Sequence, residues 1–144
     1  MDELKYYIKK IHNQLESGFT RALRKHGLTC TQYDILVYLD THTKHQNTLT
    51  HLSAHFGVKH TSMIRVLKLL DEKGFITKTR STDARSKTIH LTKSGQQVLT
   101  DVREKTPLLH KIMFDGLSDQ ELQLLDKMLQ RIYTNLESDA FRHL

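Results

Sequence analysis

The sequence predicts a mainly α-helical fold that carries one small β-hairpin. Apolar residues recur at steps of three and four over most of the 144 residues, which is the period of an amphipathic helix. Between residues 75 and 91 the period changes to two, as in a strand. Short polar caps precede several of the helical stretches. Together these observations predict helices on both sides of one hairpin.

The first three helices are expected in the N-terminal half. The first spans residues 3–25 and ends at Gly27. The second opens at Thr29, because Thr29 and Gln32 have capping-box spacing, and it turns Ile35, Leu36 and Leu39 inward. A short third helix starts at Thr48 and stops at Gly57.

The fourth helix is expected over residues 60–73. Its inner face is predicted to contain Ile64, Leu67 and Leu70, flanked by Met63 and Val66. Its outward residues near the start are His60, Thr61, Ser62, Arg65 and Lys68. A lysine, Lys59, stands where a short cap would be expected, so Thr61 is considered as a shifted cap.

A hairpin and two further helical stretches follow. Residues 75–79 and 87–91 alternate as strands, with Ile76 and Ile89 as expected buried partners across a polar tip. Thr92 can cap the next helix, which Pro107 either kinks or breaks. The box that starts at Ser118 caps the last helix.

The position of the charge narrows the class of partner. The net charge is +6, and residues 58–93 contain nine basic and three acidic side chains, so the flanks are neutral. A localised positive field indicates a polyanion. The longest apolar run, residues 35–39, is too short for a bilayer, and the N-terminus lacks a basic signal-peptide start. We therefore expect a cytoplasmic protein with no membrane partner.

Two short helices joined by a glycine turn and followed by a basic hairpin are the layout of a winged helix-turn-helix, whose second helix enters the DNA major groove. Thr61, Ser62 and Arg65 supply the small polar and long basic residues that this helix needs. Arg80 and Arg85 are long enough to reach a minor groove or its phosphates. The expected partner is double-stranded DNA.

The order and spacing of six short motifs resemble the MarR family of bacterial transcription regulators over nearly the whole chain. The motifs are Leu28-Thr29-Cys30-Thr31-Gln32, Leu52-Ser53, Gly57-Val58, Leu70-Asp71-Glu72-Lys73-Gly74-Phe75-Ile76, Asp83-Ala84-Arg85 and Leu91-Thr92-Lys93-Ser94-Gly95. The resemblance implies a homodimer with intertwined terminal helices, and often an effector pocket. It also implies that Arg85 is the minor-groove arginine, and that Asp83 positions a nearby arginine.

The resemblance and the charge divide the chain by role. Residues 1–28 are predicted to be an N-terminal dimerisation helix, residues 29–93 the winged DNA-binding domain, and residues 94–144 the C-terminal dimerisation helices. The neutral flanks hold more apolar surface than a small winged domain needs, although they could instead complete a monomer core. The predicted DNA-binding residues are Lys59, His60, Thr61, Ser62, Arg65, Lys68, Arg80, Asp83, Arg85 and Lys87.

Several residues are candidates for sensing a signal. Cys30 in the first turn of a helix is a candidate redox thiol, with an incidental thiol as the alternative. His51 and His55 lie one turn apart, yet the helical wheel places them on an outer face without a nearby acid or cysteine, so no metal site is predicted. The effector candidates, chosen from topology, are His12, Phe19, His26 and Tyr33.

These observations predict a dimeric, sequence-specific DNA-binding regulator, most simply an effector-responsive repressor of a pseudo-palindromic operator. The alternatives are a non-specific architectural DNA-binding protein, or a redox- or metal-responsive regulator of the same family. No catalytic signature or phosphate-binding glycine loop is present in the sequence, so no enzyme activity and no cofactor are expected.

Overall fold

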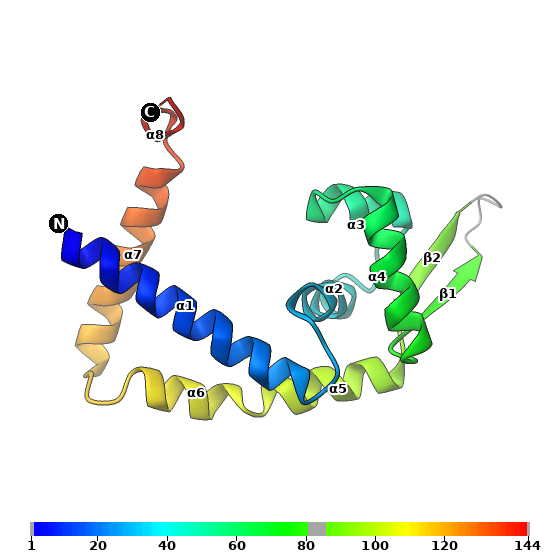
Figure 1. The fold of residues 1–144 in the computed structure, drawn as a ribbon, viewed down its shortest axis with the longest axis horizontal. Coiled ribbons are helices and arrows are strands. Elements are labelled where there is room, and N and C mark those ends of the chain that lie inside the picture. The colour runs from blue at the N-terminus through cyan, green and yellow to red at the C-terminus, as the bar shows by residue number, and fades with distance from the viewer. Residues whose placement is uncertain (1, 81–85, 144) are drawn as a thin grey trace. The chain divides into compact units, whose positions relative to one another are not determined.

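The computed structural model describes residues 2–80 and 86–143, which form two compact units divided between residues 104 and 105. The predicted mainly helical fold with one hairpin is confirmed (Figure 1). The first unit contains α1 (Asp2–Arg24), α2 (Cys30–Thr41), α3 (Leu49–Phe56), α4 (His60–Glu72), β1 (Ile76–Arg80), β2 (Lys87–Leu91) and α5 (Lys93–Arg103). The second contains α6 (Thr106–Met113), α7 (Asp119–Leu136) and α8 (Asp139–Arg142).

The predicted caps form in the first unit. Thr29 and Gln32 make a reciprocal capping box at the start of α2. The Thr48 side chain accepts a hydrogen bond from the backbone N–H of His51 in α3, which ends at Gly57 in the left-handed conformation, at φ 62°. Glycine adopts that conformation without the steric cost that a side chain incurs. Local side chains therefore determine where α2 and α3 begin and end.

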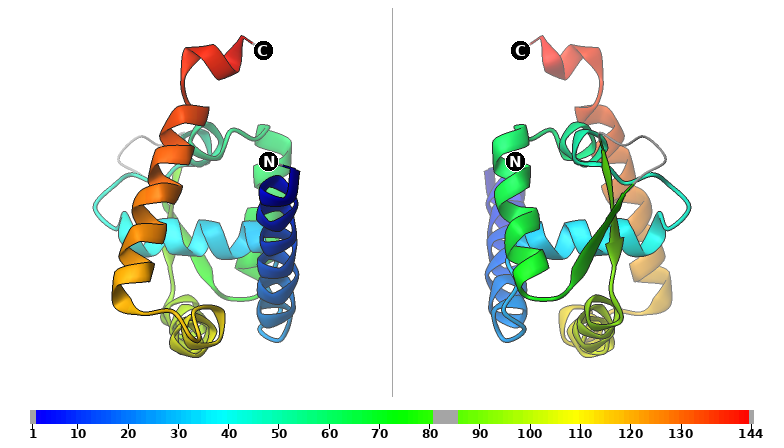
Figure 2. Two further views of the ribbon diagram at one scale, coloured as in Figure 1. Left: turned by 90° about the vertical axis from the view of Figure 1, so that its left-hand side faces the viewer. Right: turned by 90° about the vertical axis from the view of Figure 1, so that its right-hand side faces the viewer.

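The core of the first unit surrounds α2, which packs against α1, α4, α5 and β2 (Figure 2). Ile35, Leu36 and Leu39 are the residues that α2 buries at its centre, as predicted. The wall around them comes from every other element of this unit and contains Leu23, Leu52, Met63, Leu67, Leu70, Ile76, Ile89, Val98, Leu99 and Val102. Because α5 buries three residues in this core, it is part of the same unit as the hairpin.

The structure corrects the predicted orientation of α4. Met63, Leu67 and Leu70 are buried, whereas Ile64 is 51% exposed and does not belong to the inner face. Helix geometry explains the difference, because residues 63, 67 and 70 lie within about 60° of one another, while 64, 67 and 70 spread over about 120°. The narrower stripe packs against α2, α3 and β1. Ile64 is consequently turned toward the hairpin side of the helix.

The hairpin is antiparallel, and its register differs from the expected pairing. Strand β1 starts one residue later than predicted, and Ile76 faces Leu91 while Ile89 faces Lys78. Ile76 and Ile89 are both buried, as predicted, but they are not direct partners. An isolated bridge joins Thr48 to Thr88, so the segment before α3 lies along the outer edge of β2.

The second unit begins where Pro107 breaks the helical pattern. Helix α5 ends at Arg103, and α6 starts afresh with Pro107 in its first turn, where the missing N–H costs no hydrogen bond. Ser118 and Glu121 form the predicted capping box of α7. Among the described residues, no helix combines the length and apolar character that a membrane crossing requires.

Three helices present apolar side chains to solvent in the single chain. On α1 only Leu23 is buried, and α6 and α7 bury no residue. The exposed apolar side chains are Leu4, Tyr6, Tyr7, Ile8, Ile11 and Leu15 on α1, Leu108, Leu109, Ile112 and Met113 on α6, and Leu124, Met128, Leu129, Ile132, Tyr133 and Leu136 on α7. Apolar patches of this extent are typical of interaction surfaces.

Candidate nucleic-acid interface

The outer face of α4 has a stripe of exposed polar and basic side chains. Thr61, Arg65 and Lys68 are exposed at positions i, i+4 and i+7, on the side opposite Met63, Leu67 and Leu70. Within the described residues Arg65 makes no ion pair, whereas Lys68 lies 4.0 Å from Glu72 in an exposed pair. The guanidinium group of Arg65 therefore keeps its hydrogen-bond donors for an external acceptor.

The start of α4 is exposed and basic. Helix α4 begins at His60, so Lys59 is the N-cap and Thr61 lies inside the helix and is not a shifted cap. The Lys59 side chain makes no capping bond. His60 and Ser62 are also exposed in this first turn. Unsatisfied backbone N–H groups and a lysine beside the positive end of a helix both favour a nearby anion. A phosphate would satisfy them.

The hairpin beside α4 continues the positive surface. Lys78 and Arg80 on β1 and Lys87 on β2 are exposed, and Arg80 faces Lys87 in the register. Asp83 and Arg85, which were predicted to act at the tip, lie outside the described residues, so their roles stay predictions. The described part of the hairpin thus presents three cations, with Arg80 and Lys87 paired at one end of the strands and Lys78 in the middle of β1.

A cavity of about 340 Å³ lies between the first turn of α3, α4 and both strands. Its apolar wall includes the buried side chains of Leu67 and Ile89. The other residues that line it are Thr48, Leu49, Thr50, Ile64, Lys78, Ser86 and Lys87. The cavity was not predicted, because its residues come from four elements and no local sequence pattern relates them.

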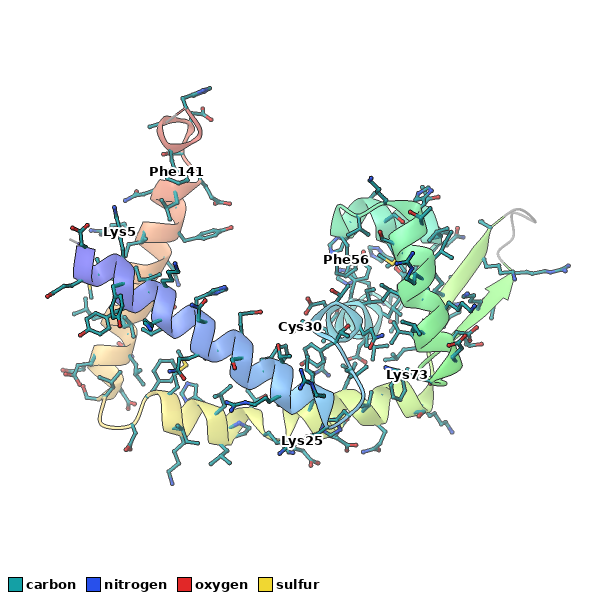
Figure 3. The ribbon with its side chains drawn as sticks, viewed as in Figure 1. Lys5, Lys25, Cys30, Phe56, Lys73 and Phe141 are labelled. Atoms are coloured by element: carbon teal, nitrogen blue, oxygen red, sulfur yellow. The ribbon has the colours of Figure 1, made fainter. Side chains whose placement is uncertain are left out.

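One basic residue of the central segment has an internal role. The Lys73 ammonium group donates hydrogen bonds to the backbone oxygen of Gly27 and, at 3.2 Å, to Oε1 of the buried Gln32 (Figure 3). These bonds connect the end of α4 to the turn between α1 and α2. Lys73 therefore holds α4 against the core and is not available as a free cation.

Three histidines, His42, His51 and His55, contact the ring of Tyr38, and a fourth packs beside them, an arrangement that the sequence did not reveal. His51 Nε2 lies 2.7 Å from the Tyr38 hydroxyl, and the rings of His42 and His55 lie 4.0 and 4.2 Å from the Tyr38 ring between centroids. His45 packs against His42. In the described parts of the chain, no group of three or more potential ligands is arranged to hold a metal ion. The cluster packs α3 against the end of α2.

Replacing Tyr38 with phenylalanine is expected to destabilise the first unit by about 0.5–1.5 kcal/mol, because His51 loses its partner in a partly buried hydrogen bond. Urea unfolding of the wild type and the variant measures this. The matched control is Tyr133→Phe, which removes a hydrogen bond to Glu137 in the second unit and should leave the stability of the first unit unchanged. Equal midpoints for Tyr38→Phe and the wild type would contradict the expected contribution.

The residues proposed to sense a signal are only partly brought together. Phe19 and Tyr33 make an edge-to-face ring contact at 5.1 Å between α1 and α2. Cys30, at the start of α2, is half-buried, with its Sγ 3.6 Å from the Thr20 hydroxyl (Figure 3). His12 is exposed, and Nε2 of His26 is buried without a hydrogen-bond partner in the described chain. Effector and redox roles for these residues stay predictions.

Partial burial, and secondarily the carboxylate of Glu16, raises the pKa of Asp34 on α2. The folded state therefore binds this proton more tightly than the unfolded state, and the resulting stability is lost as the pH rises through the raised pKa. Asp34→Asn should increase the free energy of unfolding near neutral pH and leave it unchanged in acid.

Urea unfolding of Asp34→Asn and the wild type, in a series from about pH 4 to about pH 8, measures this difference. Asp40→Asn is the contrasting control. Its carboxylate accepts a hydrogen bond from Arg103 at 2.9 Å, so its loss should destabilise the protein at neutral pH. A pH-independent difference between Asp34→Asn and the wild type would rule out the assigned origin of the shift.

The helix pair α3–α4, the glycine turn between them and the adjacent basic hairpin define a winged helix-turn-helix protein. The family described as transcriptional regulator SarA/Rot matches residues 18–102. The chain belongs to this family of regulators, and the predicted resemblance to MarR-type winged-helix proteins is confirmed.

Two similar proteins support the same class of transcriptional regulator. The chain is 24% identical over 134 residues to the HTH-type transcriptional repressor IacR of Pseudomonas putida. The match covers 92% of this chain and 79% of IacR. MarR from Oenococcus oeni has 26% identity and a TM-score of 0.61, covering 91% of this chain and 98% of MarR.

The fold also matches MepR, a transcription regulator of the Staphylococcus aureus multidrug efflux pump MepA. The TM-score is 0.81 at 20% identity, covering 92% of this chain and 98% of MepR. A MepR–DNA complex matches with a TM-score of 0.70 at 19% identity, covering 92% of this chain and 96% of that chain. At this level of identity the likeness concerns the fold.

Proposed function

We propose that this protein is a homodimeric, sequence-specific DNA-binding regulator that inserts α4 into the major groove and lays its hairpin along the flanking minor groove. The observation that carries the proposal is the exposed face of α4, where Arg65 makes no ion pair with any described residue and lies one turn from Thr61. An arginine in this setting can bind guanine through two hydrogen bonds. A fold shared with a protein solved on DNA supports this geometry.

The apolar faces of α1, α6 and α7 support the homodimer. Each is exposed in the single chain, and together they provide more apolar surface than a lone soluble chain usually leaves uncovered. A second copy offers the same surfaces, and two-fold symmetry then presents two copies of α4 to two half-sites. Dimerisation would thereby supply the affinity that one module lacks.

Repression released by a small-molecule effector is the form of regulation that we propose. IacR is named a repressor, and MepR is named as the regulator of a drug efflux pump. The region of the Phe19–Tyr33 contact between α1 and α2 is our candidate effector site. A ligand there would act by changing the spacing of the two recognition helices, which lowers affinity for the operator.

Selection from a random duplex library tests the DNA-binding proposal. We expect an inverted repeat whose half-sites lie about one helical turn apart, with an affinity that falls steeply with salt. Uniform weak binding to all duplexes would overturn sequence specificity and indicate an architectural DNA-binding protein. Loss of binding on oxidation of Cys30, or on addition of zinc, would favour the redox- or metal-responsive alternatives.

Sedimentation velocity tests the dimer separately. A dimer at micromolar concentration is expected, and charged substitutions in the apolar faces, such as Ile8→Glu or Leu129→Glu, should shift it toward the monomer. A wild-type protein that remains a monomer both alone and on DNA would overturn the homodimer.

A further inference from the structure

Ile64 is an exposed apolar residue between polar side chains of α4. On the exposed side of α4 it lies one turn after Thr61 and one turn before Lys68, and both of these are polar. Its side chain is 51% exposed, although it sits next in sequence to the fully buried Met63. A single exposed isoleucine is common on protein surfaces, so its location decides whether it matters.

The surroundings of Ile64 place it close to where the bases of bound DNA would lie. It lines the cavity between α4 and the hairpin, together with Leu67 and Ile89 on the apolar side and the cations Lys78 and Lys87. The two lysines could bind phosphates of the DNA strand that separates the major groove, which would hold α4, from the minor groove under the hairpin. Ile64 then lies between these phosphate positions and the polar stripe of Thr61 and Arg65.

The major groove offers few apolar groups to such a side chain. Among the unmodified bases only thymine carries a methyl group on its major-groove edge, and apolar side chains recognise that methyl by contact. The polar edges of the other bases would lose water against an isoleucine without gaining a hydrogen bond. Ile64 therefore favours thymine at the base step that it faces.

We infer that Ile64 is a specificity-determining residue, which reads one thymine methyl in each half-site of the operator. This inference rests on the proposed insertion of α4 into the major groove and adds a base identity to it. Arg65 would read guanine by hydrogen bonds, and Ile64 would read a neighbouring thymine by apolar contact. The recognition helix then combines two kinds of readout.

The test uses the duplex selected by the wild-type protein, resynthesised with deoxyuridine in place of one symmetric pair of thymines at a time. Deoxyuridine keeps the base pair and lacks only the methyl group. At one thymine pair the wild type should lose about threefold to fivefold in affinity per half-site, which corresponds to one buried methyl group. The Ile64→Ala variant should bind the thymine and deoxyuridine duplexes of that pair equally well.

The matched control is Leu69→Ala. Leu69 is on the same helix and is similarly exposed, at 43%, but it lies on the opposite flank, outside the residues that line the cavity. This variant should keep the wild-type preference for thymine. Thermal unfolding of both variants should match the wild type, and Ile64→Val offers a smaller truncation that should retain part of the preference.

Two results would overturn the inference while leaving the proposed function intact. Either no thymine methyl affects the binding of the wild type, or the methyl effect persists unchanged in Ile64→Ala. If selection yields no preferred duplex at all, the proposed sequence-specific function fails, and the thymine readout fails with it.

Discussion

Replacing Arg65 with alanine is expected to weaken binding to the selected operator by about 30-fold or more. A bidentate arginine–guanine contact contributes about 1–3 kcal/mol, and a symmetric dimer loses two of them. Arg65 is exposed and has no ion pair in the described chain, so its truncation should leave stability unchanged. Fluorescence anisotropy on the selected duplex and on an unrelated duplex measures both affinity and specificity.

Two further variants separate charge from geometry at Arg65. Arg65→Lys keeps the positive charge and loses the paired donors, so it should keep most of the salt dependence while losing the preference for the selected duplex. Arg24→Ala removes an exposed arginine at the end of α1 and should change neither quantity. If Arg65→Ala binds the operator as the wild type does, Arg65 is not a base-reading residue.

The second large effect is expected at Gly95, where an alanine should destabilise the first unit by about 1–3 kcal/mol. A Cβ atom there would lie 2.3 Å from the backbone oxygen of Phe75 and 2.6 Å from Cδ1 of Leu91. The Phe75 oxygen cannot move aside freely, because it accepts a hydrogen bond from the N–H of Thr92 at 3.0 Å. Thr92 in turn caps α5 through the N–H of Gly95.

The comparison variant, Gly18→Ala, is expected to change the free energy of unfolding in the opposite direction. Gly18 lies inside α1, and nothing approaches its Cβ position within 4 Å. Alanine there should stabilise the helix by about 1 kcal/mol. Urea unfolding of both variants measures the contrast. If the Gly95→Ala protein were as stable as the wild type, the close contact between the base of the hairpin and the start of α5 would not restrict residue 95 to glycine.

Local sequence predicted much of this architecture because its signals act over one helical turn. Thr29, Thr48 and Ser118 cap the helices that they precede, and Gly57 ends α3 in the left-handed conformation. Pro107 separates α5 from α6. The alternating residues on either side of the hairpin tip pair as strands. Each of these outcomes depends on backbone groups and side chains that are close in sequence.

The orientation of helix α4 and the partners of individual side chains were harder to predict, because they depend on contacts between distant segments. The apolar pattern of α4 predicted Ile64 on the inner face, which was wrong, because packing against α2, α3 and β1 buries the stripe that leaves Ile64 outside. In the sequence, Lys73 is one more basic residue of the segment 58–93. The structure shows that its ammonium group instead donates hydrogen bonds to Gly27 and Gln32. The contacts of Tyr38 with His51 and His55 join residues of α2 and α3 that no local sequence pattern relates.

Sequence patterns alone are enough to predict the class of fold, most ends of the helices and the concentration of positive charge in residues 58–93. These follow from periodicity, capping chemistry and composition, which need no knowledge of tertiary contacts. Tertiary packing is needed to establish which cations face outward, that a cavity opens between α4 and the hairpin, and that Ile64 lines it. The reason is that burial of a side chain is set by the elements packed around it, and these come from distant parts of the chain.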